Sequence, residues 1–315
     1  MYNSCKENEI LRLFSVNIRN RLKYILQNAD RLQEIRMRIN KPMIIRYDNR
    51  EYFVDERTGR LSTKCEPYIV KKNEMKETME YVCNYSLYAF QEELRQGFIT
   101  VQGGHRVGIA GKVVTEDGMI QNIKYISSIN VRIAHEIGGC SNRIMRYITN
   151  DGRMLNTIII SPPGCGKTTL LRDTIRNLSD GYDNMTGVNV GVVDERSELA
   201  ACYMGVAQNN MGYRTDILDC CPKAKGMMML IRTMSPQIIA VDEIGGSDDE
   251  NAIRYAAICG CKIIATAHGA SYEELITRDE GRMYEDIFER FIFLGNGTNV
   301  GEIKEITDKE GNRLW

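Results

Sequence analysis

An apolar run leads directly into a glycine-containing loop and then a helical stretch, and this order restricts the possible folds of the chain more than any other segment. Residues 155–160 read LNTIII, residues 161–166 read SPPGCG, and residues 167–173 read KTTLLRD. The order is close to G-x-x-x-x-G-K-[ST], in which backbone N–H groups surround a phosphate and the lysine contacts the terminal phosphates. The stretch therefore predicts a strand, a phosphate-binding loop and a helix.

One position departs from this pattern, because Ser161 stands where glycine is usual. Gly164 and Gly166 can still adopt positive φ and turn successive N–H groups toward an anion. Lys167 is expected to reach the β- and γ-phosphates and Thr168 to bind Mg²⁺, although an ordinary glycine-rich turn is the alternative. The residues expected to bind the nucleotide are Ser161, Pro162, Pro163, Gly164, Cys165, Gly166, Lys167, Thr168 and Thr169.

Composition limits the location and the class of the protein. The net charge of −1 over 315 residues gives no general attraction to nucleic acid or anionic lipid. No window approaches 18 consecutive apolar residues, and the first residues carry charges where a signal peptide would be apolar. The ten cysteines show no CxxC pair and no histidine partners for zinc, so we expect reduced thiols that fill the core. A cytoplasmic protein without a membrane span is expected.

The first part of the chain, residues 1–140, predicts a small α+β domain. Turn signals at Gly103-Gly104 and Asp117-Gly118 break its last third into a β-meander. The periodicity predicts helix over 10–27, paired strands over 32–55, helix over 72–97 and the meander over 98–134.

The second part, residues 141–315, predicts a parallel sheet covered by helices on both faces. Fully apolar strands alternate with helical stretches, which is typical of α/β proteins. We therefore predict an α/β fold, with a P-loop NTPase core and a smaller α+β N-terminal domain that divide near 138–152. The segments are NTIII, the loop and its helix, VNVGVVD, a polar helix-rich stretch, PQIIAVDE, NAIRYAAICG and CKIIATAHG.

Two acidic residues, Asp242 and Glu243, follow the apolar strand IIAV. Ligands of α/β sheets bind at the carboxyl ends of the strands, where these residues fall. Asp242 is expected to hold Mg²⁺ through water, and Glu243 to orient and deprotonate an attacking water. The alternative is an acidic loop after a buried strand.

Two further strands end in polar residues at the same expected edge. Asp194 and Glu195 could support Mg²⁺, position water or contact substrate, or they could begin a solvated helix. Thr266 and His268 are expected to hydrogen-bond the terminal phosphate. The two other histidines have weaker claims, since His105 lies in a glycine turn and His135 follows a strand, with no metal partner visible for either.

With these motifs in order, the chain resembles the stage III sporulation protein AA family and, more broadly, type II and type IV secretion ATPases and pilus motors. The motifs are ISPPGCGKTTLLRD, VVDERSE, VDEIGG and TAHG, with VQGGHRVGIAGKVV and ISSINVRIAHEIGG in the N-terminal part. The resemblance implies a RecA-like or AAA+-type core that forms a homo-oligomeric ring, commonly a hexamer, and uses ATP with Mg²⁺. It also implies a role in spore formation, on the mother-cell side of a membrane, powering membrane-embedded sporulation channel proteins that lead to the forespore.

An arginine is expected to neutralise charge on the transferred phosphate. The candidates are Arg106, Arg132 and Arg196, and each could instead be structural. Arg132 is preferred because INVRIA resembles the arginine-bearing strand of related motors. The residues expected to act in catalysis are Glu243, Lys167, His268, Glu195 and Arg132.

Two other functions compete with a motor ATPase. A nucleic-acid-associated ATPase would need a basic patch with interleaved aromatics; the stretches over 11–24 and 34–50 are locally basic, but the balanced total charge makes nucleic acid an unexpected partner. A nucleotide-gated scaffold would hydrolyse little ATP, and the presence of both Asp242 and Glu243 argues against it. No base-reading motif such as NKxD separates ATP from GTP.

Overall fold

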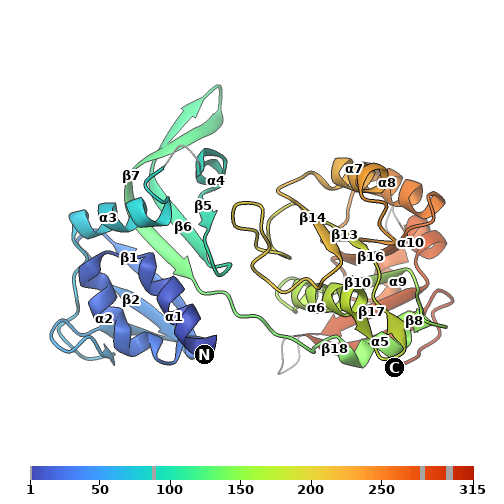
Figure 1. The fold of residues 1–315 in the computed structure, drawn as a ribbon, viewed down its shortest axis with the longest axis horizontal. Helices are drawn as coiled ribbons and strands as arrows, with labels where there is room; N and C mark the ends of the chain where they lie inside the picture. Colours follow the sequence, from blue (N-terminus) through green and yellow to red (C-terminus); the bar gives the residue numbers. More distant parts are fainter. Residues whose placement is uncertain (1, 87–89, 277–280, 296–300) are drawn as a thin grey trace. The chain divides into compact units, whose positions relative to one another are not determined.

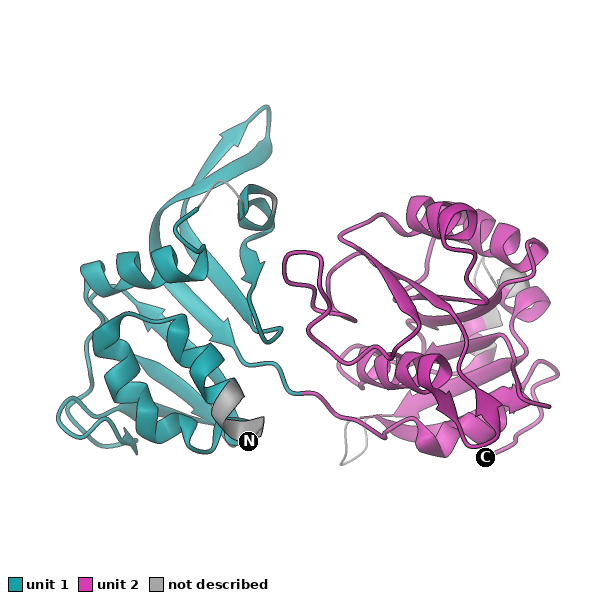
Figure 2. Cartoon of the chain, viewed as in Figure 1, with its two compact units in different colours: residues 1–135 teal, residues 136–315 magenta. Residues whose placement is uncertain are grey.

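The computed structural model describes residues 2–86, 90–276, 281–295 and 301–315. The chain forms two compact units, residues 1–135 and residues 136–315 (Figure 2). The boundary proposed from sequence, between residues 140 and 141, falls inside the second unit. Across the described ranges, none of the helices has the length and apolar character needed to cross a membrane.

The first unit is an antiparallel sheet in the order β4-β3-β2-β1-β7-β6-β5, with helices packed on it (Figure 1). The predicted α+β class and the meander are confirmed, because β5, β6 and β7 pair in sequence. The elements are α1 (Tyr2–Arg12), α2 (Val16–Leu26), a 3-10 turn (Ala29–Arg31), β1 (Leu32–Arg38), β2 (Ile44–Tyr47), β3 (Arg50–Val54), β4 (Leu61–Ser62), α3 (Lys72–Val82), α4 (Gln91–Gln96), β5 (Phe98–Thr100), β6 (Arg106–Glu116) and β7 (Met119–Arg132).

The helical stretch predicted over 10–27 is broken at residues 13–15, so it belongs to two helices, α1 and α2. Ser15 precedes α2 with extended ψ, and its N–H donates to Thr78 Oγ1 of α3 at 3.2 Å. Leu13 and Phe14 are buried at the corner. A tertiary contact to a distant helix therefore ends α1, which apolar spacing along the chain cannot reveal.

His105 is a buried structural residue of the first unit. Its Nδ1 accepts the Ala134 N–H at 3.0 Å, which joins the start of β6 to the chain after β7. Burial lowers the pKa of His105 from 6.5 to about 4. The neutral imidazole is therefore the form that the folded chain holds.

We expect acid to destabilise the first unit through His105. Because the folded pKa is the lower one, the unfolded chain binds the proton more readily, and the stability contributed by neutral His105 is complete above about pH 6.5 and is lost toward pH 4. Between pH 7 and about pH 4.5 the free energy of unfolding should fall about 2 kcal/mol more than in His105→Asn, which retains an acceptor but does not titrate. Denaturant titrations at both pH values measure this difference, and equal losses in the two proteins would contradict it.

The second unit contains the predicted parallel sheet, in the order β14-β13-β15-β16-β10-β17-β18. Every neighbouring pair is parallel except β17 and β18, which are antiparallel. The elements are α5 (Asn142–Ile148), β8 (Thr149–Asn150), β9 (Arg153–Met154), β10 (Thr157–Ile160), α6 (Lys167–Asp180), β11 (Gly181–Tyr182), β12 (Met185–Thr186), β13 (Val190–Asp194), β14 (Thr215–Asp219), α7 (Lys223–Thr233), β15 (Ile238–Val241), α8 (Ser247–Ile258), β16 (Lys262–Ala267), α9 (Tyr272–Ile276), α10 (Gly281–Ile287), β17 (Arg290–Gly295) and β18 (Glu302–Asp308).

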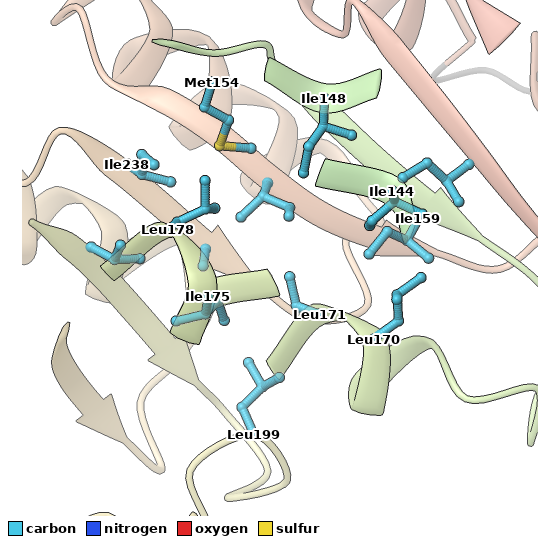
Figure 3. Packing of buried hydrophobic residues seen from close by; sticks show 14 of the residues in the cluster. Ile144, Ile148, Met154, Ile159, Leu170, Leu171, Ile175, Leu178, Leu199 and Ile238 are labelled. Atoms are coloured by element: carbon cyan, nitrogen blue, oxygen red, sulfur yellow. The ribbon is translucent and has the colours of Figure 1, made fainter. Parts of the chain in front are cut away.

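Helices cover both faces of this sheet, as the unbroken apolar strands predict. Side chains alternate along β10, with Ile159 in one core and Ile158 and Ile160 in the other. Figure 3 shows the first of these cores, in which α6 packs against Ile159 and α5. α6 contributes the following apolar side chains to it: Leu170, Leu171, Ile175 and Leu178.

The polar helix-rich stretch predicted after Asp194 is wrong over residues 195–214, which form an irregular segment without a helix and lead into β14. Turn-forming residues, including Asn209, Asn210 and Gly212, interrupt the helical pattern. The first helix after β13 is α7. The segment connects two neighbouring parallel strands of the sheet.

None of the cysteines whose side chains the structure describes forms a disulfide, but not all of them fill the core. Cys83, Cys165, Cys202 and Cys261 are buried, whereas Cys220 and Cys259 are exposed. Burial raises the pKa of Cys202 to about 12, which leaves that thiol protonated and unreactive. The core-filling interpretation is therefore wrong for the two exposed thiols, which follow β14 and α8.

Candidate functional site

The loop at residues 161–166 leaves β10 near the centre of the parallel sheet and leads into α6. Gly164 and Gly166 have φ of 78° and 92°, the left-handed conformation that favours glycine. A Cβ on Gly164 would meet nothing within 4 Å, so the backbone angle, not the space, requires glycine there. The loop thus has the backbone that a phosphate cradle needs.

Ser161 continues the strand pairing of the sheet at the carboxyl end of β10. Its N–H donates to Ala267 O at 3.3 Å, continuing the pairing of β10 with β16, and its hydroxyl donates to Pro162 O at 2.8 Å. Its φ is not positive. This explains why serine can replace glycine at the start of the loop without disturbing the turn that follows.

The Lys167 ammonium lies over this loop. Its Nζ donates to Ser161 O at 3.0 Å and to Pro162 O at 3.4 Å, and it lies 3.2 Å from Nδ1 of His268. Burial lowers the pKa of Lys167, while the charges of Glu243 and Asp242 oppose this shift. A point charge is therefore held at the helix start, within reach of an anion in the loop.

Thr168 and Asp242 are brought together across 74 residues of sequence. Thr168 Oγ1 donates to Asp242 Oδ2 at 2.8 Å, and the buried Thr266 hydroxyl donates to the other carboxylate oxygen. In the described ranges, no three His, Cys, Asp or Glu side chains converge to hold a metal ion. One hydroxyl and one carboxylate nevertheless suit Mg²⁺, which takes its remaining ligands from water and phosphate.

Glu243 stands beside this pair in a left-handed backbone conformation, with φ of 51°. Its N–H donates to Thr266 Oγ1 at 2.8 Å, which holds the backbone in place. One carboxylate oxygen accepts from Arg196 Nη1 at 2.7 Å, and the other lies 3.3 Å from His268 Nε2. Such a backbone costs energy and persists where the surroundings enforce it, often at functional sites.

Thr266 and His268 differ in what they can do. The Thr266 hydroxyl is fully buried and occupied by Asp242 and by the Glu243 N–H, so it positions the acids and does not face a ligand. His268 bridges Lys167 and Glu243 and has a partly exposed side chain. The expected phosphate contact therefore remains open for His268 alone.

Asp194 is a buried anchor, and both interpretations proposed for it from sequence are wrong. Its carboxylate accepts the N–H groups of Glu198, Leu199 and Ala200 at 2.8–2.9 Å, and only 1% of the residue is exposed. Those bonds occupy its oxygens, and no helix follows it. Arg172 of α6 donates to the carbonyls of Glu198 and Leu199, which fastens the same loop to the helix after the phosphate loop.

Glu195 forms an ion pair with Lys223 Nζ at 2.6 Å. A small hollow brings this pair beside the other acids, and its lining residues are Asp194, Glu195, Arg196, Glu198, Lys223, Asp242 and Glu243. The acids from β13 and β15 thus share one edge of the sheet, as predicted. Sequence reasoning missed Lys223 and Arg172, because no local pattern marks a lysine 28 residues from its partner or an arginine that serves a neighbouring loop.

The predicted arginines lie in different places. Arg196 pairs with Glu243, as described above. Arg106 and Arg132 are directly opposite each other on β6 and β7, on the face of the first unit's sheet that also carries Arg36 and Arg38. Like charges opposite each other in a sheet are destabilising, and Glu34 of β1 offsets part of the charge of this arginine hollow through its ion pair with Arg36 at 2.6 Å. Arg132 is two-thirds exposed, and among the residues that the structure describes its one ion-pair contact is to Glu34, at 3.9 Å.

Comparison with known sequences finds a family model and a curated relative that each match nearly the whole chain. The sequence model of the family described as "Sporulation stage III, protein AA" matches residues 4–314. The Stage III sporulation protein AA of Bacillus subtilis (strain 168) is 40% identical over 311 residues, which cover 98% of this chain and 97% of that protein.

Among solved structures, an ATPase and a pilus retraction motor share the fold. The ATPase DotB of Legionella pneumophila superposes with a TM-score of 0.55 at 16% identity, covering 88% of this chain and 75% of that one. The pilus retraction motor PilT, solved with bound ADP, gives a TM-score of 0.58 at 13% identity, covering 86% and 77%. At these identities the likeness concerns the fold, and it matches the predicted RecA-like P-loop core with a smaller N-terminal α+β domain.

Proposed function

Because the chain belongs to the sporulation stage III protein AA family, we propose that it is a P-loop ATPase that drives a secretion-like complex during spore formation. The observation that supports this most is the convergence of Lys167, Thr168 and Asp242 at one end of the parallel sheet. A cation, a hydroxyl and a carboxylate beside a glycine loop form the donor set for a Mg²⁺–nucleotide. ATP is the proposed nucleotide on the ground of the family.

Each residue of the site has a proposed role. The loop N–H groups and Lys167 bind the phosphates, Thr168 and Asp242 hold Mg²⁺, and Glu243 accepts a proton from the attacking water. When bound, Mg²⁺ offsets the charge of the phosphates. Arg196 and His268 hold the two oxygens of the Glu243 carboxylate and so orient it. Glu195 is the reserve candidate for the base.

The assembly completes the proposal. We assign the motor to a homo-oligomeric ring, a hexamer as in the related motors, that works on membrane-embedded channel proteins from the mother-cell side. Light scattering with and without a non-hydrolysable ATP analogue measures the particle mass and so tests whether a ring forms. A nucleotide-dependent ring supports a motor, whereas a fixed monomer favours a scaffold or a simple switch.

Removal of the Asp242 charge should separate metal use from nucleotide use. In Asp242→Asn the Thr168 contact can persist, but the Mg²⁺ ligand loses its charge. Mg²⁺ should therefore increase the nucleotide affinity of the variant by a factor about tenfold smaller than it does for the wild type. Calorimetry of ATP-analogue binding with Mg²⁺ and with EDTA measures this. Asp151→Asn, an exposed acid in the turn between β8 and β9, is the matched control. An unchanged Mg²⁺ response would remove Asp242 from the metal site.

An arginine supplied by another subunit should be detectable by mixing. Arg132→Ala should bind ATP but lose turnover by about 10³-fold, the scale of an arginine that stabilises the transferred phosphate. Mixed with Lys167→Ala, it should recover part of the activity, because some interfaces then pair an intact loop with an intact Arg132. Arg46→Ala, on β2 of the same unit, is the control. No recovery at any ratio, in mixtures shown to co-assemble, returns Arg132 to a structural role.

One observation favours a second candidate, an ATPase associated with nucleic acid. The arginine hollow of the first unit lies beside Phe98, whose ring is 4.8 Å from the Arg106 guanidinium. Basic side chains beside an aromatic ring suit single-stranded nucleic acid. Salt-dependent binding of a single-stranded oligonucleotide that Arg36→Ala weakens would support this function, and absence of binding at low salt would exclude it.

A further inference from the structure

A large groove in the first unit lies outside the candidate nucleotide site. It has a volume of about 1290 Å³ and lies between α3, α4 and the middle of β7. Met75 and Met79 of α3 and Leu94 of α4 contribute to its lining, together with Ile123 and Ile126 of β7. Small-molecule pockets span roughly 300 to 1,000 Å³, so this groove is large enough for a segment of polypeptide. Its volume equals about three turns of a helix about 10 Å across.

A bulge in β7 shapes one wall of the groove. Ala110 pairs with Ser128 and Lys112 with Lys124, so a single residue of β6, Gly111, faces residues 125–127 of β7. A Cβ on Gly111 would lie 2.7–2.9 Å from backbone atoms of β7, so glycine is required there. Bulges redirect side chains, and this one turns Tyr125 outward, with 81% of the residue exposed.

Two exposed tyrosines line this groove in left-handed backbone conformations. Tyr125 has φ of 49° and Tyr85 has φ of 60°, and both are more than 70% exposed. A bulky residue in this conformation is an outlier that costs about 1 to 2 kcal/mol. Tyrosine is also a preferred anchor of protein interfaces, because its ring supplies contact area at a low cost in side-chain entropy. Both observations indicate a binding surface.

Within β7, residues 119–127 lie beside β6 and do not pair with β1, so one side of this segment is open. This open side is a poor template for an added strand. Gln121 O accepts from Arg95 Nε, the Ile123 N–H donates to Asn122 Oδ1, and Ser127 O accepts the Ile39 N–H. These contacts occupy backbone groups at both ends and near the middle of the open segment. Recognition by strand addition depends on such groups, whereas a helix satisfies its own backbone and contributes only side chains. The groove therefore favours a helix.

The basic side chains at the rim of the groove favour a helix that carries acidic residues. Among the described residues that line the groove, Lys72, Lys76 and Lys124 stand against a single acid, Glu80. Lys76 lies 3.7 Å from Glu80. Within the described ranges, Lys72 and Lys124 have no acidic partner. An occupant with acidic residues beside its apolar stripe would supply the missing charges.

We propose that this groove binds an amphipathic α-helix of a partner protein, with an apolar stripe over Met75 and Met79 and acidic residues toward Lys72 and Lys124. Tyr125 is the exposed anchor of the contact. The inference is independent of the nucleotide site, since it rests on the first unit alone.

The test uses the full chain and a panel of designed helical peptides about three to four turns long. Each carries leucines at i, i+3, i+4 and i+7, with glutamate, glutamine or lysine at the flanking positions. Fluorescence anisotropy should give saturable binding, at least about tenfold tighter for the glutamate peptide than for the lysine peptide. Tyr125→Ala should weaken binding by about tenfold. The double variant Lys72→Glu/Lys124→Glu should reverse the preference, so that the lysine peptide binds more tightly.

Matched controls come from α2, which does not line the groove. Tyr24→Ala removes another exposed tyrosine, and Lys23→Glu reverses another exposed lysine, and neither should change peptide affinity. The proposal is overturned if no peptide of the panel binds saturably, or if control and groove variants weaken binding equally. Tighter binding of an alternating valine peptide without helical spacing would instead assign the groove to a strand. Self-association lost in Tyr125→Ala, with no peptide binding, would assign it to a second copy of the chain.

Discussion

Lys167→Ala should bind ATP about 10- to 100-fold more weakly than the wild type. Charge-assisted hydrogen bonds contribute about 1.5 to 3 kcal/mol each, and Lys167 is the ammonium that lies over the loop. The loop backbone remains, so residual binding through its N–H groups is expected. Calorimetric titration with an ATP analogue measures the loss.

The fold should survive this substitution, because Lys167 contacts loop carbonyls and His268 and is not part of the apolar cores. Lys262→Ala is a suitable control: Lys262 begins β16 at the opposite end of the strands, where it pairs with Glu289. It should leave affinity unchanged. Wild-type affinity in a folded Lys167→Ala protein would mean that the loop is a structural turn.

Glu243→Gln should retain ATP and hydrolyse it about 10² to 10⁴ times more slowly, which is the usual contribution of a general base. The amide has the same shape and can still accept from Arg196, so binding and structure should be preserved. Phosphate release under single-turnover conditions, together with ATP affinity, separates a loss of chemistry from a loss of binding.

Glu195→Gln provides the matched comparison, because this acid lines the same hollow but pairs with Lys223. Its effect on turnover should be much smaller. If instead Glu243→Gln turned over at the wild-type rate and Glu195→Gln did not, the base would be Glu195. If neither substitution slowed turnover in a protein that binds ATP, the nucleotide-gated scaffold would become the better description.

Much of the second unit could be predicted because its signals are local. Gly164 and Gly166 are required by backbone angles of the loop itself, and the unbroken apolar strands carry the evidence for a parallel sheet. Acids at the ends of β13 and β15 must meet at one edge, since parallel strands end on the same side. Family resemblance then followed from the order of these motifs.

The same local logic failed where polar residues follow a strand. Asp194 and Asp242 both end apolar runs, yet Asp194 is buried under three backbone N–H groups, whereas Asp242 contacts Thr168. Sequence patterns cannot separate them, because the difference lies in whether the following loop folds back over the carboxylate. The segment over 195–214 is a second example, because its polar sequence predicts helix and the structure is irregular.

The phosphate-loop motif, the α/β order of the second unit and the α+β character of the first can be predicted from the amino-acid sequence, because each depends on backbone preferences and side-chain periodicity over a few neighbouring residues. The partner of each charged group, in contrast, depends on the three-dimensional fold. Arg196 reaches Glu243 across 47 residues, and Lys167 reaches His268 across 101. Such pairings depend on how strands are ordered in the sheet, and strand order is set by the packing of the whole core, which no local pattern contains.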